Sequence, residues 1–370
     1  MNITVWYITK TEKYCSKKGD SYNFDPGMLV DDGHVYMYTG FAPNAEFPWI
    51  FRFFMKFGGA SFKGGCCVEL EPDMITVKSD TYQLIPGEKE AAGTSFEGHG
   101  FFEASSPRKI NEKYYLIYSS SLSHELCYAT SDSPVGGFEY GGTIISIGDV
   151  GLSGITTKEQ ARNYTGNTHG GLVEINGQWY IFYHRQTNLK KCNRQGCAEK
   201  IFFKEDGSIP QVEITSCGLN DGPLMGVGKY EARVACNLFD NEDSFSYDAY
   251  MDKNISTHPY FTQTGEDREY DGDQYIANMR DGAVAGFKYF DFKEYHPANI
   301  TVEMKGKAKG KFIVALDESL SKVAAEIPVE IDSKDYMSIR AEISLPDEVC
   351  PLFFKFTGDG EVDFFSFELS

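Results

Sequence analysis

Three polar side chains recur in register along the first half of the sequence and could perform acid–base chemistry. Asp25, Glu103 and His169 each stand eight or nine residues before a tight turn. Two carboxyl groups can act as proton donor and proton acceptor, and an imidazole changes its charge near neutral pH. Taken singly, each of these residues is more typical of a structural role, in which its side chain accepts hydrogen bonds from backbone N–H groups at a turn. Their shared spacing instead predicts one common site.

Repeated β-hairpins would position these side chains. The segments MLVDDGHVYMYTG, RKINEKYYLIYSS and VEINGQWYIFYHR each join a short strand, a tight turn and an alternating aromatic strand, and end at Gly40, Ser120 and Arg185. Further strand candidates are CCVEL, LCYATS, YGGTIIS and CAEKIFF, so each unit could hold four antiparallel strands. Repeated four-stranded units predict propeller blades, whose innermost strands would bring the three side chains to one central axis.

The sequence after a Gly/Pro-rich stretch at residues 217–228 no longer carries the hairpin pattern. Its short alternating strands, which include ITVEMKG, KFIVALD, PLFFKFTG and EVDFFSFELS, predict a β-sandwich. We therefore expect an all-β chain with a propeller-like domain over residues 1–228 and a sandwich over residues 229–370. The second domain holds 28 of the 54 acidic residues but only 15 of the 35 basic residues.

Charge and segment composition restrict the partners. The net charge of -19 repels phosphate backbones and anionic lipid surfaces, so neither nucleic acid nor a membrane is expected as a partner, whereas neutral sugars fit. The first residues lack the pattern of a secretory signal, and no apolar run is long enough to span a membrane, which predicts a cytoplasmic protein. The nine cysteines form no metal-type pairs and are expected to be free thiols.

Three ordered motifs resemble glycoside hydrolase family 43. NFDPGMLVDDGHVYMYTG and FFEASSPRKINEKYYLIYSS resemble its second and third catalytic segments, and NTHGGLVEINGQWYIFYHR followed by NRQGCAEKIFF resembles its final blade. The resemblance covers residues 20–228. It implies a five-bladed propeller that cleaves arabinofuranosides or xylosides with inversion, takes an oligosaccharide or polysaccharide as its partner and requires no cofactor. The C-terminal region resembles a carbohydrate-binding module of family 6.

The resemblance also implies roles for four residues. Glu103 matches the general acid, and Asp25 matches the carboxylate that orients this acid and keeps its pKa high, as a neighbouring negative charge does. His169 matches an axial histidine that lies near a calcium ion or a water molecule in relatives, so calcium is the metal to consider. Arg194 matches an arginine that reaches toward the sugar. Inverting hydrolysis additionally needs a second carboxylate to activate water, roughly 6.5–9.5 Å from the acid.

Some of these residues also allow simpler interpretations. Glu97 and His99 compete for the acid role, although Glu97 lies outside the spacing set by the hairpins. Arg194 could be a surface residue beside two lysines. His184 and Arg185 end an aromatic strand, where a structural salt bridge is the favoured interpretation.

One expected family feature has no counterpart in the sequence. The aspartate that acts as general base lies on an earlier family segment, and the 24 residues before Asp25 contain no matching strand. We therefore expect about three of five blades and no general base, which would slow hydrolysis by roughly 10²–10⁴-fold. Three interpretations remain open at this point: the C-terminal part of a longer glycosidase, a chain completed by a second polypeptide that supplies the missing blades, or a non-catalytic carbohydrate-binding protein.

Overall fold

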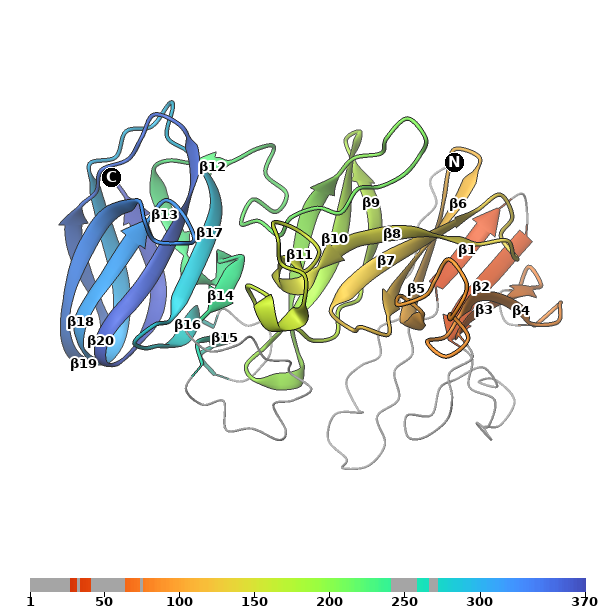
Figure 1. The fold of residues 1–370 in the computed structure, drawn as a ribbon, viewed down its shortest axis with the longest axis horizontal. Helices are drawn as coiled ribbons and strands as arrows, with labels where there is room; N and C mark the ends of the chain where they lie inside the picture. The colour runs from red at the N-terminus through yellow and green to blue at the C-terminus, as the bar shows by residue number, and fades with distance from the viewer. Residues whose placement is uncertain (1–26, 32–33, 41–63, 74–75, 241–257, 266–271) are drawn as a thin grey trace. The chain divides into compact units, whose positions relative to one another are not determined.

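The computed structural model describes six stretches of the chain, and strands dominate them (Figure 1). Apart from strands, the regular elements described are three single 3₁₀ turns, so the predicted all-β class is confirmed. Within these stretches no helix has the length and apolar character needed to cross a membrane. The cysteines described are free thiols, as predicted. The described stretches are residues 27–31, 34–40, 64–73, 76–240, 258–265 and 272–370.

The chain divides into two compact units, and the first contains the N-terminal hairpins. One unit comprises the chain up to Leu122 together with Tyr128–Tyr140, and the other comprises Ser123–Cys127 together with Gly141–Ser370. The boundary predicted between residues 228 and 229 stays a prediction. Two four-stranded sheets have the orders β1-β2-β3-β4 and β5-β6-β7-β8. Their strands are β1 (Gly27–Asp31), β2 (His34–Gly40), β3 (Gly64–Leu70), β4 (Tyr82–Pro86), β5 (Phe101–Ile110), β6 (Lys113–Ser120), β7 (Glu125–Ser131) and β8 (Glu139–Ser146).

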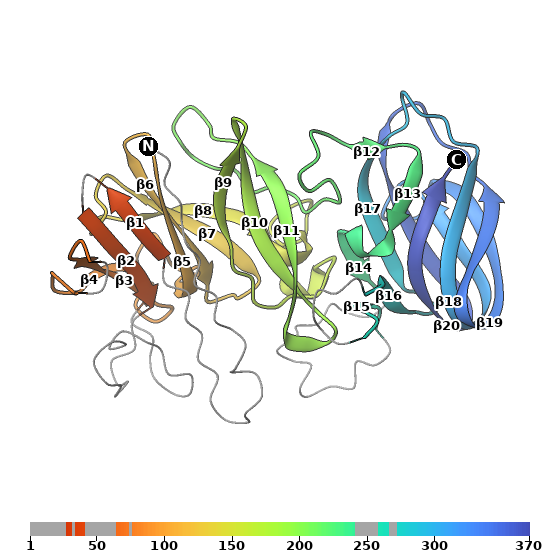
Figure 2. The same ribbon diagram turned by 180° about the vertical axis from the view of Figure 1, so that it is seen from behind.

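A third sheet contains three described strands in the order β11-β10-β9, rather than the expected four (Figure 2). The strands are β9 (Gly171–Ile175), β10 (Gln178–Thr187) and β11 (Lys190–Ile201). All three predicted hairpins are present as the antiparallel pairs β1–β2, β5–β6 and β9–β10. Asn176 and Gly177 join β9 to β10 with φ values of 52° and 83°, which is the left-handed backbone that a two-residue hairpin turn requires. No sheet among the described strands closes on itself, so the number of blades stays a prediction.

The C-terminal region, called the sandwich below, forms a nine-stranded sheet around a core rich in phenylalanine. Figure 1 shows how its strands curl. Phe287 contacts Phe354 and Phe367 through edge-on rings with centroids 5.4 and 4.9 Å apart, an arrangement that aromatic side chains favour in protein cores. The strands are β12 (Leu224–Met225), β13 (Gly228–Glu231), β14 (Asn237–Phe239), β15 (Tyr260–Gln263), β16 (Gln274–Met279), β17 (Val284–Asp291), β18 (Asn299–Ala315), β19 (Val323–Glu342) and β20 (Val349–Leu369).

Two pairs of strands expected as separate elements are single long strands. ITVEMKG and most of KFIVALD lie together on β18, and PLFFKFTG and all but the last residue of EVDFFSFELS lie together on β20. The glycines between them indicate turns in the sequence, but the two strands pair with each other through this region. A side chain at Gly358 would collide with the carbonyl oxygen of Lys309, so glycine here permits close approach of the strands rather than a turn.

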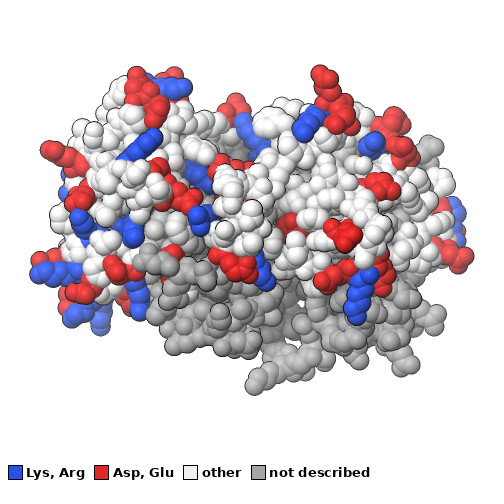
Figure 3. Space-filling view, in the orientation of Figure 1, with Lys and Arg blue, Asp and Glu red and all other residues white. Residues whose placement is uncertain are grey.

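Charged side chains of both signs alternate over the sandwich, although its sequence is acidic. Figure 3 shows red and blue groups interspersed on the visible face. Three lysines of β18 pair with acidic residues of the neighbouring strand β19, and all six side chains are exposed. Pairs of this kind contribute little to stability because water screens them. The pairs are Lys307–Asp332 at 2.7 Å, Lys309–Glu330 at 3.1 Å and Lys311–Glu326 at 2.8 Å.

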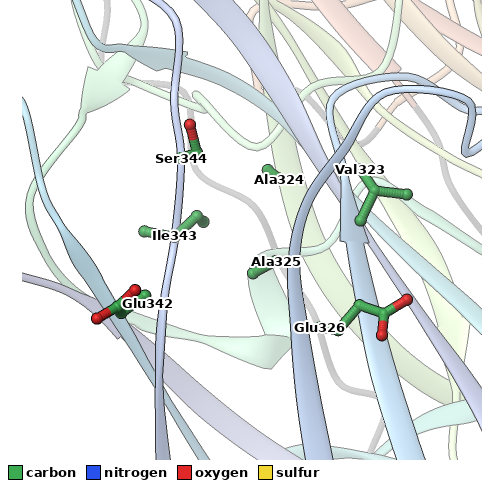
Figure 4. A pocket seen from close by; sticks show the side chains of 7 residues that line it. All are labelled: Val323, Ala324, Ala325, Glu326, Glu342, Ile343 and Ser344. Atoms are coloured by element: carbon green, nitrogen blue, oxygen red, sulfur yellow. The ribbon is translucent and has the colours of Figure 1, made fainter.

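A hollow of about 410 Å³ opens at the edge of the sandwich, where β19 begins and ends (Figure 4). A backbone hydrogen bond of 3.0 Å from Ser344 N to Ala324 O joins its two sides. Its lining combines aliphatic side chains with two glutamates and contains no aromatic ring on which a sugar could stack. The lining residues are Val323, Ala324, Ala325, Glu326, Glu342, Ile343 and Ser344.

Candidate active site

Glu103 lies on β5 and is only 3% exposed. Its Cα is paired with that of Ser119 on β6, and the register shifts by one residue on each side of it, between Phe101 and Glu103 and between Glu103 and Ser106. Such β-bulges change the direction in which a side chain leaves a strand. A buried carboxyl group at an irregular point of a sheet is a candidate for a proton donor.

The competing acidic residue, Glu97, has a local structural role. Its side chain is exposed, and its Oε2 accepts a hydrogen bond of 3.0 Å from the Gly93 backbone N–H. His99 stacks on the ring of Tyr140 with centroids 4.7 Å apart, and its carbonyl oxygen accepts a bond of 2.8 Å from the Tyr118 hydroxyl. The exposed turn position of Glu97 favours the buried Glu103 over Glu97 for the acid role.

The other predicted site residues do not all fall within the same part of the structure. Asp25 lies outside the described residues. Glu103 belongs to one compact unit, whereas His169 and Arg194 belong to the other. The convergence of these side chains on one axis therefore stays a prediction.

His169 precedes β9 and contacts His184 of β10. The His169 backbone N–H donates to His184 Nδ1 at 3.2 Å, and the two rings meet edge-on with centroids 5.2 Å apart. Because Nδ1 accepts this bond, the His184 proton resides on Nε2, which donates to Asn167 Oδ1 at 3.3 Å. Between these segments, a side chain at Gly170 would collide with the carbonyl oxygen of Phe182. His184 therefore holds the backbone of His169 in place.

Arg194 is exposed on β11 and lies opposite Gln186 of β10. Residues that alternate along a strand share a face, and so do residues directly opposite each other, which places Arg194 and Gln186 on the face of His184. The structure thus brings Arg194 to the same sheet and the same face as the partner of His169. An exposed guanidinium in this position can donate several hydrogen bonds to a sugar.

Arg185 lies on the opposite face of this sheet and is 6% exposed. It donates to the carbonyl oxygens of Ala235 at 2.6 Å and Arg233 at 2.7 Å, and its guanidinium stacks 3.6 Å above the ring centroid of Phe261. The structural role predicted for Arg185 is confirmed, but its hydrogen-bond partners are backbone carbonyls and Gln195 rather than the expected carboxylate. It ties β10 to the sandwich.

Glu199 of β11 is a buried carboxyl group that the sequence analysis did not select. It accepts bonds of 2.7 Å from both the backbone N–H and the hydroxyl of Thr215, and one of 3.3 Å from the Tyr183 hydroxyl. Burial raises its pKa to about 8. Register places it on the face of Arg185, away from His184 and Arg194, so its role is structural. The sequence feature that could have indicated a buried carboxyl group here is the position of this glutamate within the apolar segment CAEKIFF.

The donors described around His169 do not suit calcium. They are imidazole nitrogens and one amide oxygen, whereas calcium takes six to eight oxygen ligands, usually with carboxylates among them.

A model of glycosyl hydrolases family 43 matches residues 6–209, which is more than half of the chain. This span includes Glu103, His169 and Arg194. A xylosidase/arabinosidase from Thermoclostridium stercorarium is 44% identical over 359 residues, covering 95% of this chain and 71% of the relative.

Two solved structures are similar at lower identity. A family 43 arabinoxylan arabinofuranohydrolase from Bacillus subtilis, solved with cellotetraose, is 21% identical with a TM-score of 0.46, covering 94% of this chain and 66% of that one. A family 6 carbohydrate-binding module from Clostridium stercorarium, solved with cellobiose, is 16% identical with a TM-score of 0.31, covering 40% of this chain and 98% of the module. On the family match and the 44% identity, the chain belongs to family 43 of the glycosyl hydrolases.

Proposed function

We propose that this protein hydrolyses arabinofuranosyl or xylosyl bonds in neutral glycans of the xylan and arabinoxylan type, with Glu103 as the general acid. The family match and the relative named xylosidase/arabinosidase support this substrate class. The observation that carries the assignment of the acid is the burial of Glu103 between two register shifts of β5, while the competing Glu97 is exposed and bonds its own turn.

The proposed chemistry is an inverting displacement at the anomeric carbon. The protonated Glu103 donates its proton to the glycosidic oxygen as the bond to the leaving group breaks, and water attacks from the opposite face of the sugar. Asp25 is proposed as the carboxylate that orients Glu103 and acts on it as a neighbouring negative charge. The second carboxylate, which takes a proton from the attacking water, is assigned to no residue of this chain.

His169 and Arg194 are proposed to bind the sugar. The His184 contact fixes the backbone of His169, and Arg194 extends from the same face of the sheet into solvent. The hydroxyl groups of a neutral sugar accept hydrogen bonds from a guanidinium group. They can donate a hydrogen bond to one imidazole nitrogen or accept one from the other. We further propose that the three N-terminal sheets are blades of the five-bladed family propeller, in which these residues and Glu103 would share one site.

The proposal is tested by turnover of aryl arabinofuranosides and aryl xylosides with the purified chain. Glu103→Gln should reduce kcat/KM by roughly 10²–10⁴-fold for a poor leaving group. The loss should be small for an activated leaving group such as dinitrophenolate, which departs without protonation. Glu97→Gln is the matched control and should leave both rates unchanged.

Each other outcome identifies an alternative. Equal rates for Glu103→Gln and the unchanged protein would refute the assignment of the acid. Sugar binding without turnover, by the chain alone and after addition of azide as an external nucleophile, would support a non-catalytic carbohydrate-binding protein. Turnover that appears only with a second polypeptide would show that a partner completes the site.

A further inference from the structure

The backbone of β5 is irregular at the residue that follows the proposed acid. Ala104 has φ = 66°, the left-handed conformation that residues with a side chain rarely adopt within a strand. It is 8% exposed and lies between Glu103 and Ser106, where the register with β6 shifts. Left-handed residues are ordinary in tight turns, but this one lies inside a ten-residue strand.

This irregularity has a consequence for the direction of Glu103. Phe101 is 1% exposed and stacks on Tyr118 with centroids 5.8 Å apart, so its face of β5 packs against the core. In a regular strand, residues two apart share a face, and Glu103 would point into the same apolar packing as Phe101. Because the register shifts on either side of Glu103, its side chain need not follow this alternation. The left-handed Ala104 lies just before Ser106, where β5 resumes its pairing with β6.

A second unfavourable feature lies beside the first. The hydroxyl oxygen of Ser105 is buried and has no hydrogen-bond partner in the described part of the chain. A buried hydroxyl without a partner and a left-handed alanine each cost stability. Two adjacent violations of local preference are expected where a protein gives up stability for the geometry of a site.

We propose that Ala104 is a positioning residue for Glu103: its left-handed backbone sets the direction in which the carboxyl group meets the glycosidic oxygen. This inference rests on the proposed function of Glu103. Glycine adopts the same φ without strain, so Ala104→Gly should preserve the geometry. Valine is branched at Cβ and strongly disfavours this conformation, so Ala104→Val should force β5 toward regular pairing.

The test measures kcat/KM for one activated and one poor leaving group in Ala104→Gly, Ala104→Val and Asn111→Val. The quantity compared is the ratio of these two kcat/KM values. Asn111 is the matched control, because it has φ = 54° in the same hairpin but is exposed at the turn. Ala104→Val should lose roughly 10- to 100-fold in kcat/KM for the poor leaving group, the size of effect that a misplaced group produces. It should lose little for the activated one. Asn111→Val should lower the melting temperature without changing the ratio, and Ala104→Gly should leave the ratio unchanged.

A second measurement does not depend on turnover. The carboxyl ¹³C resonance of Glu103, assigned through its loss in Glu103→Gln, should move in Ala104→Val and stay in place in Ala104→Gly and Asn111→Val. An unmoved resonance, or an unchanged ratio in Ala104→Val, would overturn the positioning role. If Glu103→Gln itself left the ratio unchanged, the proposed acid would be wrong instead, so the two failures are distinguishable.

Discussion

Replacement of Lys288 by methionine is expected to destabilise the second compact unit strongly. Lys288 lies on β17 and is buried, and its Nζ contacts Asp149 Oδ2 at 3.1 Å and Glu213 Oε1 at 2.8 Å. Asp149 is also buried, and its other oxygen accepts a bond of 2.8 Å from the Ile214 N–H. Without the lysine, the two carboxylates remain close together and uncompensated. Breaking a buried ion pair from one side costs about 3–5 kcal/mol.

The cost can be measured by urea and thermal unfolding. A unit of this size loses roughly 2–4 °C in Tm per kcal/mol, so Lys288→Met should lower its Tm by roughly 6–20 °C. The matched control is Lys307→Met, which removes an exposed pair with Asp332 and should have no measurable effect. Adding Asp149→Asn and Glu213→Gln to Lys288→Met removes the uncompensated charges and should recover part of the loss.

The pH dependence gives a further check of the same reasoning. In Lys288→Met, the destabilisation should shrink as the pH falls, because burial raises the pKa of Asp149 and protonation of this group removes its uncompensated charge. A loss below about 1 kcal/mol at pH 7, or a loss that does not change with pH, would refute the conclusion that uncompensated charge is its cause.

Three further results are expected. Burial raises the pKa of Glu199 to about 8. This group therefore stabilises the folded state fully below its ordinary pKa, and the stabilisation is lost as the pH rises through about 8. Glu199→Gln should flatten the pH dependence of urea unfolding over this range. His184→Ala frees the backbone of His169 and should raise KM more than it lowers kcat. His184→Asn, whose side chain can still accept a hydrogen bond, should restore part of the affinity. Sodium azide should accelerate turnover of activated glycosides and give a glycosyl azide, detected by mass spectrometry, if no carboxylate of the chain activates water; an azide-independent rate would contradict this.

Local sequence patterns were sufficient to predict the hairpins. Asn176 and Gly177 provide the left-handed turn, and the flanking residues alternate between apolar and polar, so both signals concern neighbours in the sequence. The acid candidate Glu103 was also identified in this way, through its spacing before a turn and its family motif. The same local signals were misleading at Gly358, where a glycine typical of turns allows two long strands to approach.

The sequence by itself therefore determined the all-β class, the three hairpins, the family and the acid candidate. Tertiary structure decided the register shifts around Glu103, the left-handed Ala104, the contact of His184 with His169, and the burial of Lys288 between two acidic residues. The physical reason is the range of the interactions. A turn or an alternating strand depends on residues next to one another, whereas Lys288 and Asp149 are 139 residues apart and meet only after the chain has packed.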